Sequence, residues 1–156
     1  MPGNSRISES LMPPSFLFRE ALAEDRAAMA RIYHHCLASA AWMPPEVAAV
    51  ADFDRDTEGE RLFVMESAGR VIGFISIWEP ESFIHHLYVD PETQGRGVGP
   101  GLLTGLQRHV SPPWRLKCSS NNHRAHQFYL RQGWLERETG DSDTGPYWLM
   151  EKLFPG

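Results

Sequence analysis

The order of hydrophobic patterns along the chain predicts an α/β fold, with a mixed and mostly antiparallel central sheet flanked by helices. Segments with strand-type composition alternate with segments whose apolar residues recur every three or four positions. Three strand patterns follow one another directly, which predicts a meander, and a helix pattern later separates two strands, which predicts one parallel crossover. The resulting element order is β-α-α-β-β-β-α-β-α-β-β.

Four helices are predicted from apolar residues at three- and four-residue intervals. Acidic residues open the first helix, where they oppose the positive end of the helix dipole, and Gly133 closes the last one. The predicted ranges are 24–40, 46–53, 98–110 and a segment that begins at Asn121 or Asn122.

Seven strands are predicted from β-branched and aromatic residues that lie between turn-forming residues. The turn at 67–69 joins the second and third strands in a hairpin, and the polar segment 140–145 is predicted to be a loop between the last two strands. The predicted strands are 16–20, 62–66, 70–78, 83–89, 114–118, 134–139 and 146–153.

The length and composition are those of a single globular domain. The chain has 156 residues, of which 42% are hydrophobic and 22% are charged, and a chain of this size can bury its own core. Residues 1–15 are rich in proline and serine, contain Gly3 and Asn4, and are predicted to form a flexible arm. Residues 16–154 are predicted to form the domain.

Charge, apolar runs and cysteines argue against several classes of function. The net charge of −5 does not supply the basic field that nucleic-acid binding uses. The longest apolar candidate, residues 71–78, is far shorter than the roughly 18 residues of a membrane span, and the N-terminus matches a secretory signal poorly. Cys36 and Cys118 have no disulfide or zinc-ligand spacing, so we expect a cytoplasmic protein.

The most informative segment is QGRGVGPG at residues 94–101, between a strand and a helix. Its glycines let backbone N–H groups approach an anion, and the positive helix end adds to the attraction, so the segment predicts a phosphate-bearing ligand. A purely structural turn is the alternative. The dinucleotide pattern GxGxxG fails at Pro100 and Leu102, and the nucleotide pattern GxxxxGK[ST] fails as well.

Two motifs carry a resemblance to a known family. Gln94, Gly97 and Gly99 match Q/R-x-x-G-x-G/A, and residues 122–134 match N-x-x-A-x-x-F-Y-x-x-x-G-F, with Trp134 in place of the final Phe. Both motifs are similar to those of the GNAT superfamily of acyl-coenzyme A-dependent N-acyltransferases, and the likeness spans roughly 16–153. It implies a GNAT-like fold and an N-acetyltransferase that moves acetyl from acetyl-CoA to a primary amine by direct attack in a ternary complex.

The resemblance also implies where acetyl-CoA binds. The backbone of Leu87, Tyr88 and Val89 would pair with the pantetheine arm, and Asn122 and Phe128 would flank it. Pro100 departs from the family pattern because it has no N–H to donate. The residues that would hold the pyrophosphate are Gln94, Gly95, Arg96, Gly97, Val98 and Gly99.

Two catalytic roles follow from the same resemblance. Tyr129 matches the tyrosine that protonates the coenzyme sulfur, although an aromatic residue at this helical spacing also fits core packing. The amide of Leu87 would stabilise the oxyanion.

A third role, removal of the amine proton, is predicted for His85. Strand alternation separates His85 from His86 and places His85 with Phe83 and Leu87 on one face. An ordinary histidine pKa of about 6.5 suits proton removal near neutral pH. A structural histidine is the alternative for His85, and members of the family also use ordered water and several weak bases.

The remaining expectations concern metals, partners and a different class of function. The histidines lack the i, i+4 pairing with a carboxylate that indicates zinc, so no metal is predicted, and Cys118 is expected to be structural. A small-molecule amine is favoured as acceptor because no peptide-docking segment is evident, and the resemblance makes a homodimer plausible. The alternative function is a noncatalytic acyl-CoA-binding or sensing module, against which the retained Tyr129 argues.

Overall fold

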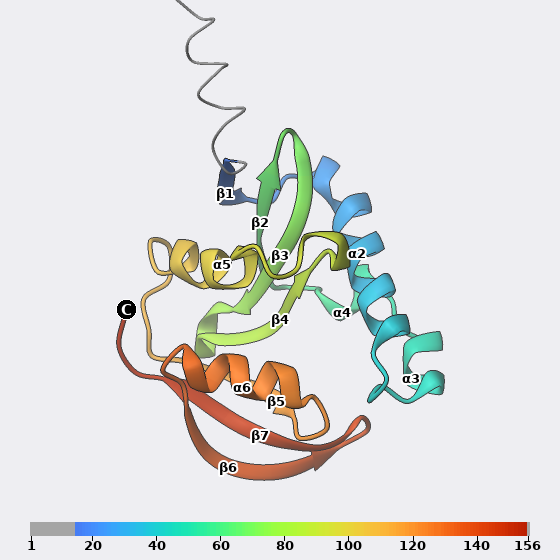
Figure 1. The fold of residues 1–156 in the computed structure, drawn as a ribbon, viewed down its shortest axis with the longest axis vertical. Helices are drawn as coiled ribbons and strands as arrows, with labels where there is room; N and C mark the ends of the chain where they lie inside the picture. Colours follow the sequence, from blue (N-terminus) through green and yellow to red (C-terminus); the bar gives the residue numbers. More distant parts are fainter. Residues whose placement is uncertain (1–14, 156) are drawn as a thin grey trace, which may run out of the picture.

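The computed structural model describes residues 15–155. Seven strands form one sheet in the order β1-β2-β3-β4-β5-β7-β6, and every neighbouring pair is antiparallel except β4 and β5 (Figure 1). The predicted fold class is confirmed, while the predicted arm lies outside the described residues except for Ser15. The strands are β1 (Phe16–Glu20), β2 (Arg61–Ser67), β3 (Arg70–Trp78), β4 (Phe83–Val89), β5 (Trp114–Ser119), β6 (Leu135–Ser142) and β7 (Gly145–Lys152).

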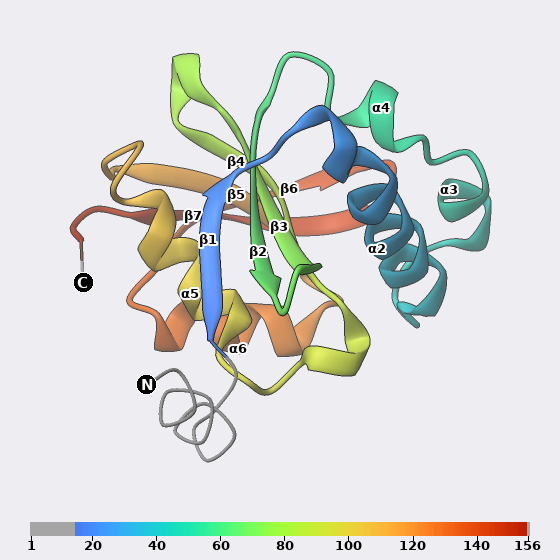
Figure 2. The same ribbon diagram turned by 90° about the horizontal axis from the view of Figure 1, so that it is seen from above.

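Helices cover both faces of the sheet, with α2 on one face and α5 and α6 on the other (Figure 2). Neighbouring residues of a strand therefore enter different cores: Phe63 packs under α5, whereas Val64 packs under α2. In the described residues no helix is long and apolar enough to cross a membrane. The α-helices are α2 (Arg26–Ser39), α3 (Pro45–Ala49), α4 (Phe53–Asp56), α5 (Val98–Leu106) and α6 (His123–Arg131).

Two predicted segments differ most from the structure. The segment 46–53 is not one helix, because Asp52 has an extended backbone and its side chain accepts a hydrogen bond from the Arg55 N–H at 3.0 Å, which starts α4 as a separate helix. The predicted loop 140–145 is mostly strand. Gly140 pairs with Tyr147 and Ser142 with Gly145, so the polar residues continue the ladder and leave a tight turn.

Candidate active site

Strands β4 and β5 are joined at a single point and then separate. Their register contains one pair, Phe83 with Arg115, and the Arg115 N–H donates to the Ser82 carbonyl at 3.1 Å. Beyond this pair, β4 continues to Val89 and β5 continues to Ser119, and the two strands do not pair with each other. The sheet therefore contains two facing strand edges whose backbone groups are open to a ligand.

The direction of the β4 backbone shows which groups face this opening. The Asp90 N–H donates to the Ile72 carbonyl of β3 at 2.8 Å, and backbone direction alternates along a strand. Leu87 and Val89 therefore turn their N–H and C=O groups away from β3, toward the opening, whereas Tyr88 turns them toward β3. The directions fit the expectation for Leu87 and Val89, but the backbone of Tyr88 does not fit the predicted pairing with a pantetheine arm.

The glycine-rich loop lies beside the end of β4 and opens α5. Gly95 and Gly97 have φ angles of +82° and +83°, a conformation that glycine adopts without strain. The Gly101 N–H donates to the Gly97 carbonyl at 3.0 Å, so the helix begins directly after Gly97. The Val98 and Gly99 N–H groups are in the first helical turn, where no intrahelical acceptor exists, and they can meet an anion.

Gln94 and Gly99 connect this loop to neighbouring elements, and Arg96 adds a positive charge to it. Gln94 Nε2 donates to the Val89 carbonyl at 3.4 Å, and a Cβ atom at Gly99 would lie 3.4 Å from the Phe128 ring. Glycine at this position lets α6 approach the start of α5. Arg96 is exposed on the same loop, where its positive charge suits a phosphate.

The predicted residues of α6 have two different environments. Asn122 caps the helix, because its Oδ1 accepts the Ala125 N–H at 3.2 Å. Phe128 is partly buried and packs against the core that lies beneath α5 and α6. Its ring lies 5.1 Å from the ring of Tyr129, so both aromatic residues belong to one packed group.

Tyr129, on α6, is buried in the core that Leu87 of β4 and Cys118 of β5 also enter. Its side chain is 8% exposed, and its electrostatic neighbours are Cys118 on β5 and Tyr88 on β4. Burial, the largest cause, raises the pKa of Tyr129 far above its ordinary value, so the hydroxyl keeps its proton. Among the described residues this hydroxyl has no hydrogen-bond partner, and it is free to donate to a ligand.

A β-bulge changes the geometry at the two histidines of β4. Ser76 pairs with His86, but the next residue of β3, Ile77, pairs with Ile84. His85 is therefore an extra residue that has no partner on β3. A period-two pattern in the sequence contains no signal for this insertion.

The bulge overturns the predicted facing of His85. Ile84 and Leu87 pack in the same core, although strict alternation would place them on opposite faces. Phe83 and Leu87 consequently lie on opposite faces. The His85 ring keeps its contact with Phe83, at 5.1 Å between centroids, but it does not share a face with Leu87.

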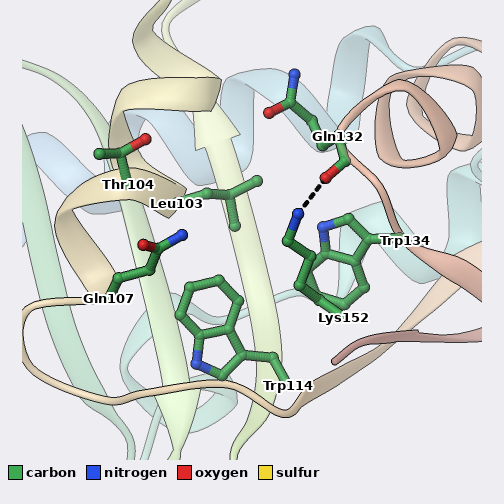
Figure 3. A pocket seen from close by; sticks show the side chains of 7 residues that line it. All are labelled: Leu103, Thr104, Gln107, Trp114, Gln132, Trp134 and Lys152. Atoms are coloured by element: carbon green, nitrogen blue, oxygen red, sulfur yellow. Dashed lines mark hydrogen bonds between the residues drawn. The ribbon is translucent and has the colours of Figure 1, made fainter. Parts of the chain in front are cut away.

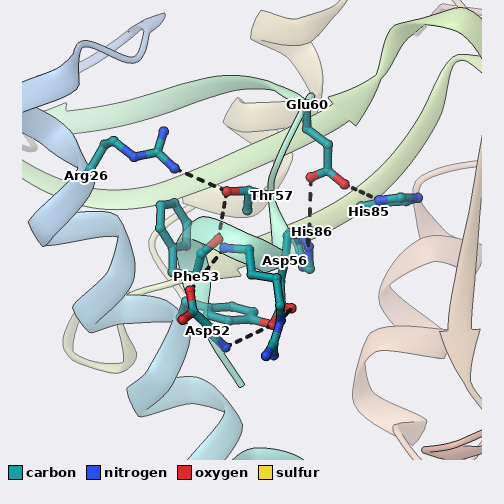
Figure 4. A network of polar contacts seen from close by, with 10 residues as sticks. Arg26, Asp52, Phe53, Asp56, Thr57, Glu60, His85 and His86 are labelled. Carbon is teal, nitrogen blue, oxygen red and sulfur yellow. Dashed lines mark hydrogen bonds and ion pairs between the residues drawn. The ribbon is translucent and has the colours of Figure 1, made fainter. Parts of the chain in front are cut away.

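Both histidine rings instead converge on Glu60, the residue before β2 (Figure 4). His85 Nδ1 is hydrogen-bonded to Glu60 Oε2, and His86 Nε2 lies 3.9 Å from Oε1. The Glu60 side chain is 4% exposed, while the His85 side chain is 42% exposed. Sequence reasoning did not predict this contact, because Glu60 lies 25 positions before His85 and belongs to no local motif.

Glu60, His85 and His86 form the one metal-ligand type cluster among the described residues, with ligand atoms within 4.8 Å of one another. However, His86 Nε2 is hydrogen-bonded to the Asp56 carbonyl at 3.2 Å. A carbonyl oxygen only accepts, so this nitrogen carries the proton and has no lone pair for a metal. The cluster fits a hydrogen-bonded network better than a metal centre.

One cavity borders this cluster at Glu60, and another lies away from it. One, of about 340 Å³, opens beside Glu60 between the end of β1 and the start of β2, next to Arg26. A much smaller one lies near the C-terminal end of α5, where Lys152 Nζ donates to the Gln132 carbonyl at 2.5 Å (Figure 3). None of the predicted site residues lines the smaller cavity, so it is not the candidate site.

Known proteins resemble this chain in both sequence and fold. A model of the acetyltransferase (GNAT) family matches residues 23–134. An uncharacterized N-acetyltransferase of Methanocaldococcus jannaschii is 31% identical over 97 residues, and an L-amino acid N-acyltransferase of Escherichia coli is 36% identical over 101 residues. These alignments cover 54% and 56% of this chain but only 42% and 59% of the two relatives, so the chain spans about half of their length.

Solved structures agree with the family match. A GCN5-related N-acetyltransferase of Rhodopseudomonas palustris superposes with a TM-score of 0.74 at 25% identity, covering 92% of this chain and 99% of its own. An acetyltransferase of Salmonella typhimurium, solved with its cofactor acetyl-CoA, has a TM-score of 0.66 at 20% identity, covering 88% and 93%. The split between β4 and β5, the glycine-rich start of α5 and the family match lead to one conclusion: this chain belongs to the GNAT family of acetyltransferases.

Proposed function

We propose that the protein transfers acetyl from acetyl-CoA to a primary amine by direct attack in a ternary complex. The observation that carries this proposal is the open edge of β4 beside the glycine-rich loop. An extended pantetheine arm can bond to the outward backbone groups of Leu87 and Val89 while the amides of residues 97–99 hold the pyrophosphate. The acetyl-CoA bound to the Salmonella relative supports the choice of donor.

The reaction needs three proton and charge movements, and the site offers a group for each. The amine nitrogen attacks the thioester carbonyl carbon, and the Leu87 N–H donates to the oxyanion that forms. The carbon–sulfur bond then breaks, and Tyr129 gives its proton to the departing thiolate. His85 accepts the proton that the amine loses.

The two cysteines support direct transfer. Both are free, and burial raises the pKa of Cys36 and of Cys118 to about 11. A thiol with such a pKa contains little thiolate near neutral pH, so Cys118 is a poor nucleophile for a covalent acyl intermediate. Free thiols also suit a reducing compartment, and we place the protein in the cytoplasm.

The acceptor proposed is a small primary amine. The name of the Escherichia coli relative, an L-amino acid N-acyltransferase, makes free amino acids the first compounds to test. Coenzyme A release should be measured against a panel of amino acids and other small amines, with acetyl-CoA binding measured in parallel. Turnover is the expected result, whereas tight binding without turnover across a broad panel would favour an acyl-CoA sensor.

Gly97→Val should weaken acetyl-CoA binding by about tenfold or more, because the new side chain crowds the amides that approach phosphate. Calorimetric titration of the folded variant measures this effect. Gly69→Val is the matched control, since Gly69 also has a positive φ and an empty Cβ position but lies in the β2–β3 turn. Equal affinity of both variants would remove the loop from the coenzyme site.

Tyr129→Phe should lower kcat by about 100-fold while leaving the affinity for acetyl-CoA nearly unchanged, because only the proton donor is lost. Steady-state kinetics and calorimetry together give this separation. Tyr147→Phe, which removes a hydroxyl from the β7 hairpin, should retain turnover. A fully active Tyr129→Phe enzyme would show that this residue only packs the core.

His85→Gln should lower the pH–rate profile by about 100-fold, because glutamine accepts no proton from the amine. His86→Gln should keep the profile: burial lowers the pKa of His86, and a glutamine amide can still donate to the Asp56 carbonyl. A normal His85→Gln profile beside a damaged His86→Gln profile would reverse these roles.

A further inference from the structure

We infer that Glu60 is a positioning residue that fixes the tautomer and orientation of His85, so that His85 Nε2 accepts the amine proton. The inference rests on the proposed acetyl transfer and extends it to a residue outside both sequence motifs. It stands on the bulge in β4, the burial of the Glu60 carboxylate and the single hydrogen bond that this carboxylate receives.

The bulge explains why the two side chains can meet. A regular β4 strand would pair each of its residues with β3, but the extra residue His85 has no partner there. Its ring reaches past the end of β3 to Glu60, which directly precedes β2. The ring is also partly exposed, so a substrate can reach the nitrogen that does not face Glu60.

Hydrogen-bond chemistry assigns the proton within this pair. An ionised carboxylate only accepts, so the contact between His85 Nδ1 and Glu60 Oε2 requires the proton on Nδ1. The lone pair of the neutral ring is then on Nε2. Because Nε2 of His85 makes no hydrogen bond among the described residues, this nitrogen remains the one that can accept a proton.

Among the described residues, the Glu60 carboxylate makes its one side-chain hydrogen bond to His85. Glu60 Oε1 is buried and has no hydrogen-bond partner among the described residues, and His86 Nε2 is too distant at 3.9 Å to supply one. His86 instead directs this nitrogen to the Asp56 carbonyl. A buried carboxylate with one unsatisfied oxygen lowers the stability of the folded protein. The same carboxylate can stabilise the imidazolium that forms on His85 during proton transfer, and this gives a functional reason for its burial.

Double-mutant kinetics test whether Glu60 acts through His85. Glu60→Gln, which keeps the shape and an acceptor oxygen but loses the charge, should lower kcat about tenfold with an unchanged KM for acetyl-CoA. Glu60→Ala should have a larger effect, and adding it to His85→Gln should cause no further loss, because a positioning residue has nothing left to position. Glu79→Gln, which removes a nearby carboxylate paired with Arg61, should retain turnover.

The tautomer itself can be measured without turnover. Long-range ¹H–¹⁵N correlation spectra of histidine-labelled protein should show His85 with its proton on Nδ1 in the parent and a mixture of tautomers in Glu60→Ala. A proton on Nε2 in the parent, or an unchanged kcat in both Glu60 variants, would overturn the inference. Failure of the parent to acetylate any amine would instead refute the proposed acetyl transfer, and the spectra keep these two results distinguishable.

Discussion

The single backbone contact between β4 and β5 is the constraint on which the whole site depends. Pairing at Phe83 and Arg115 holds the two halves of the sheet together, and its absence further along leaves the facing backbone groups of β4 and β5 without partners on the opposite strand. Such groups are costly unless water or a ligand satisfies them. The fold thus keeps an opening at the centre of the sheet, where a regular sheet would have an unbroken row of backbone hydrogen bonds between neighbouring strands.

The elements around this opening are positioned by close packing rather than by long-range charge. Glycine at position 99 admits the Phe128 ring, and Gly105 lies directly against the ring of Phe18 on β1. A Cβ atom at Gly105 would come within 2.3 Å of that ring, so α5 cannot retreat from or slide along the sheet without disturbing the core. The phosphate-facing turn is attached to the same core as β4, because Val98 lies in that core and Leu87 and Val89 pack against it.

Local patterns predicted most of the fold, because periodicity reports which face of each element is buried. Residue type added to this: β-branched and aromatic residues predicted the bounds of the strand at 83–89, and the capping preference of asparagine predicted the helix start at Asn122. Periodicity contains no information about an inserted residue, so the facing of His85 was wrong. Glu60 meets His85 only through the pairing of distant strands, and no single-sequence signal joins them. The separate helix α4 depends on one capping side chain, Asp52, within an otherwise continuous helical pattern.

Hydrogen exchange of the β4 amides tests the central claim most directly. At saturating acetyl-CoA, the account predicts slower exchange for the Leu87 and Val89 amides, which face the opening, and little change for the Tyr88 amide, which already faces β3. Residue-resolved NMR provides the comparison within one strand and one sample. Unchanged exchange at Leu87 and Val89 with acetyl-CoA bound would contradict the claim that the open edge of β4 receives the coenzyme.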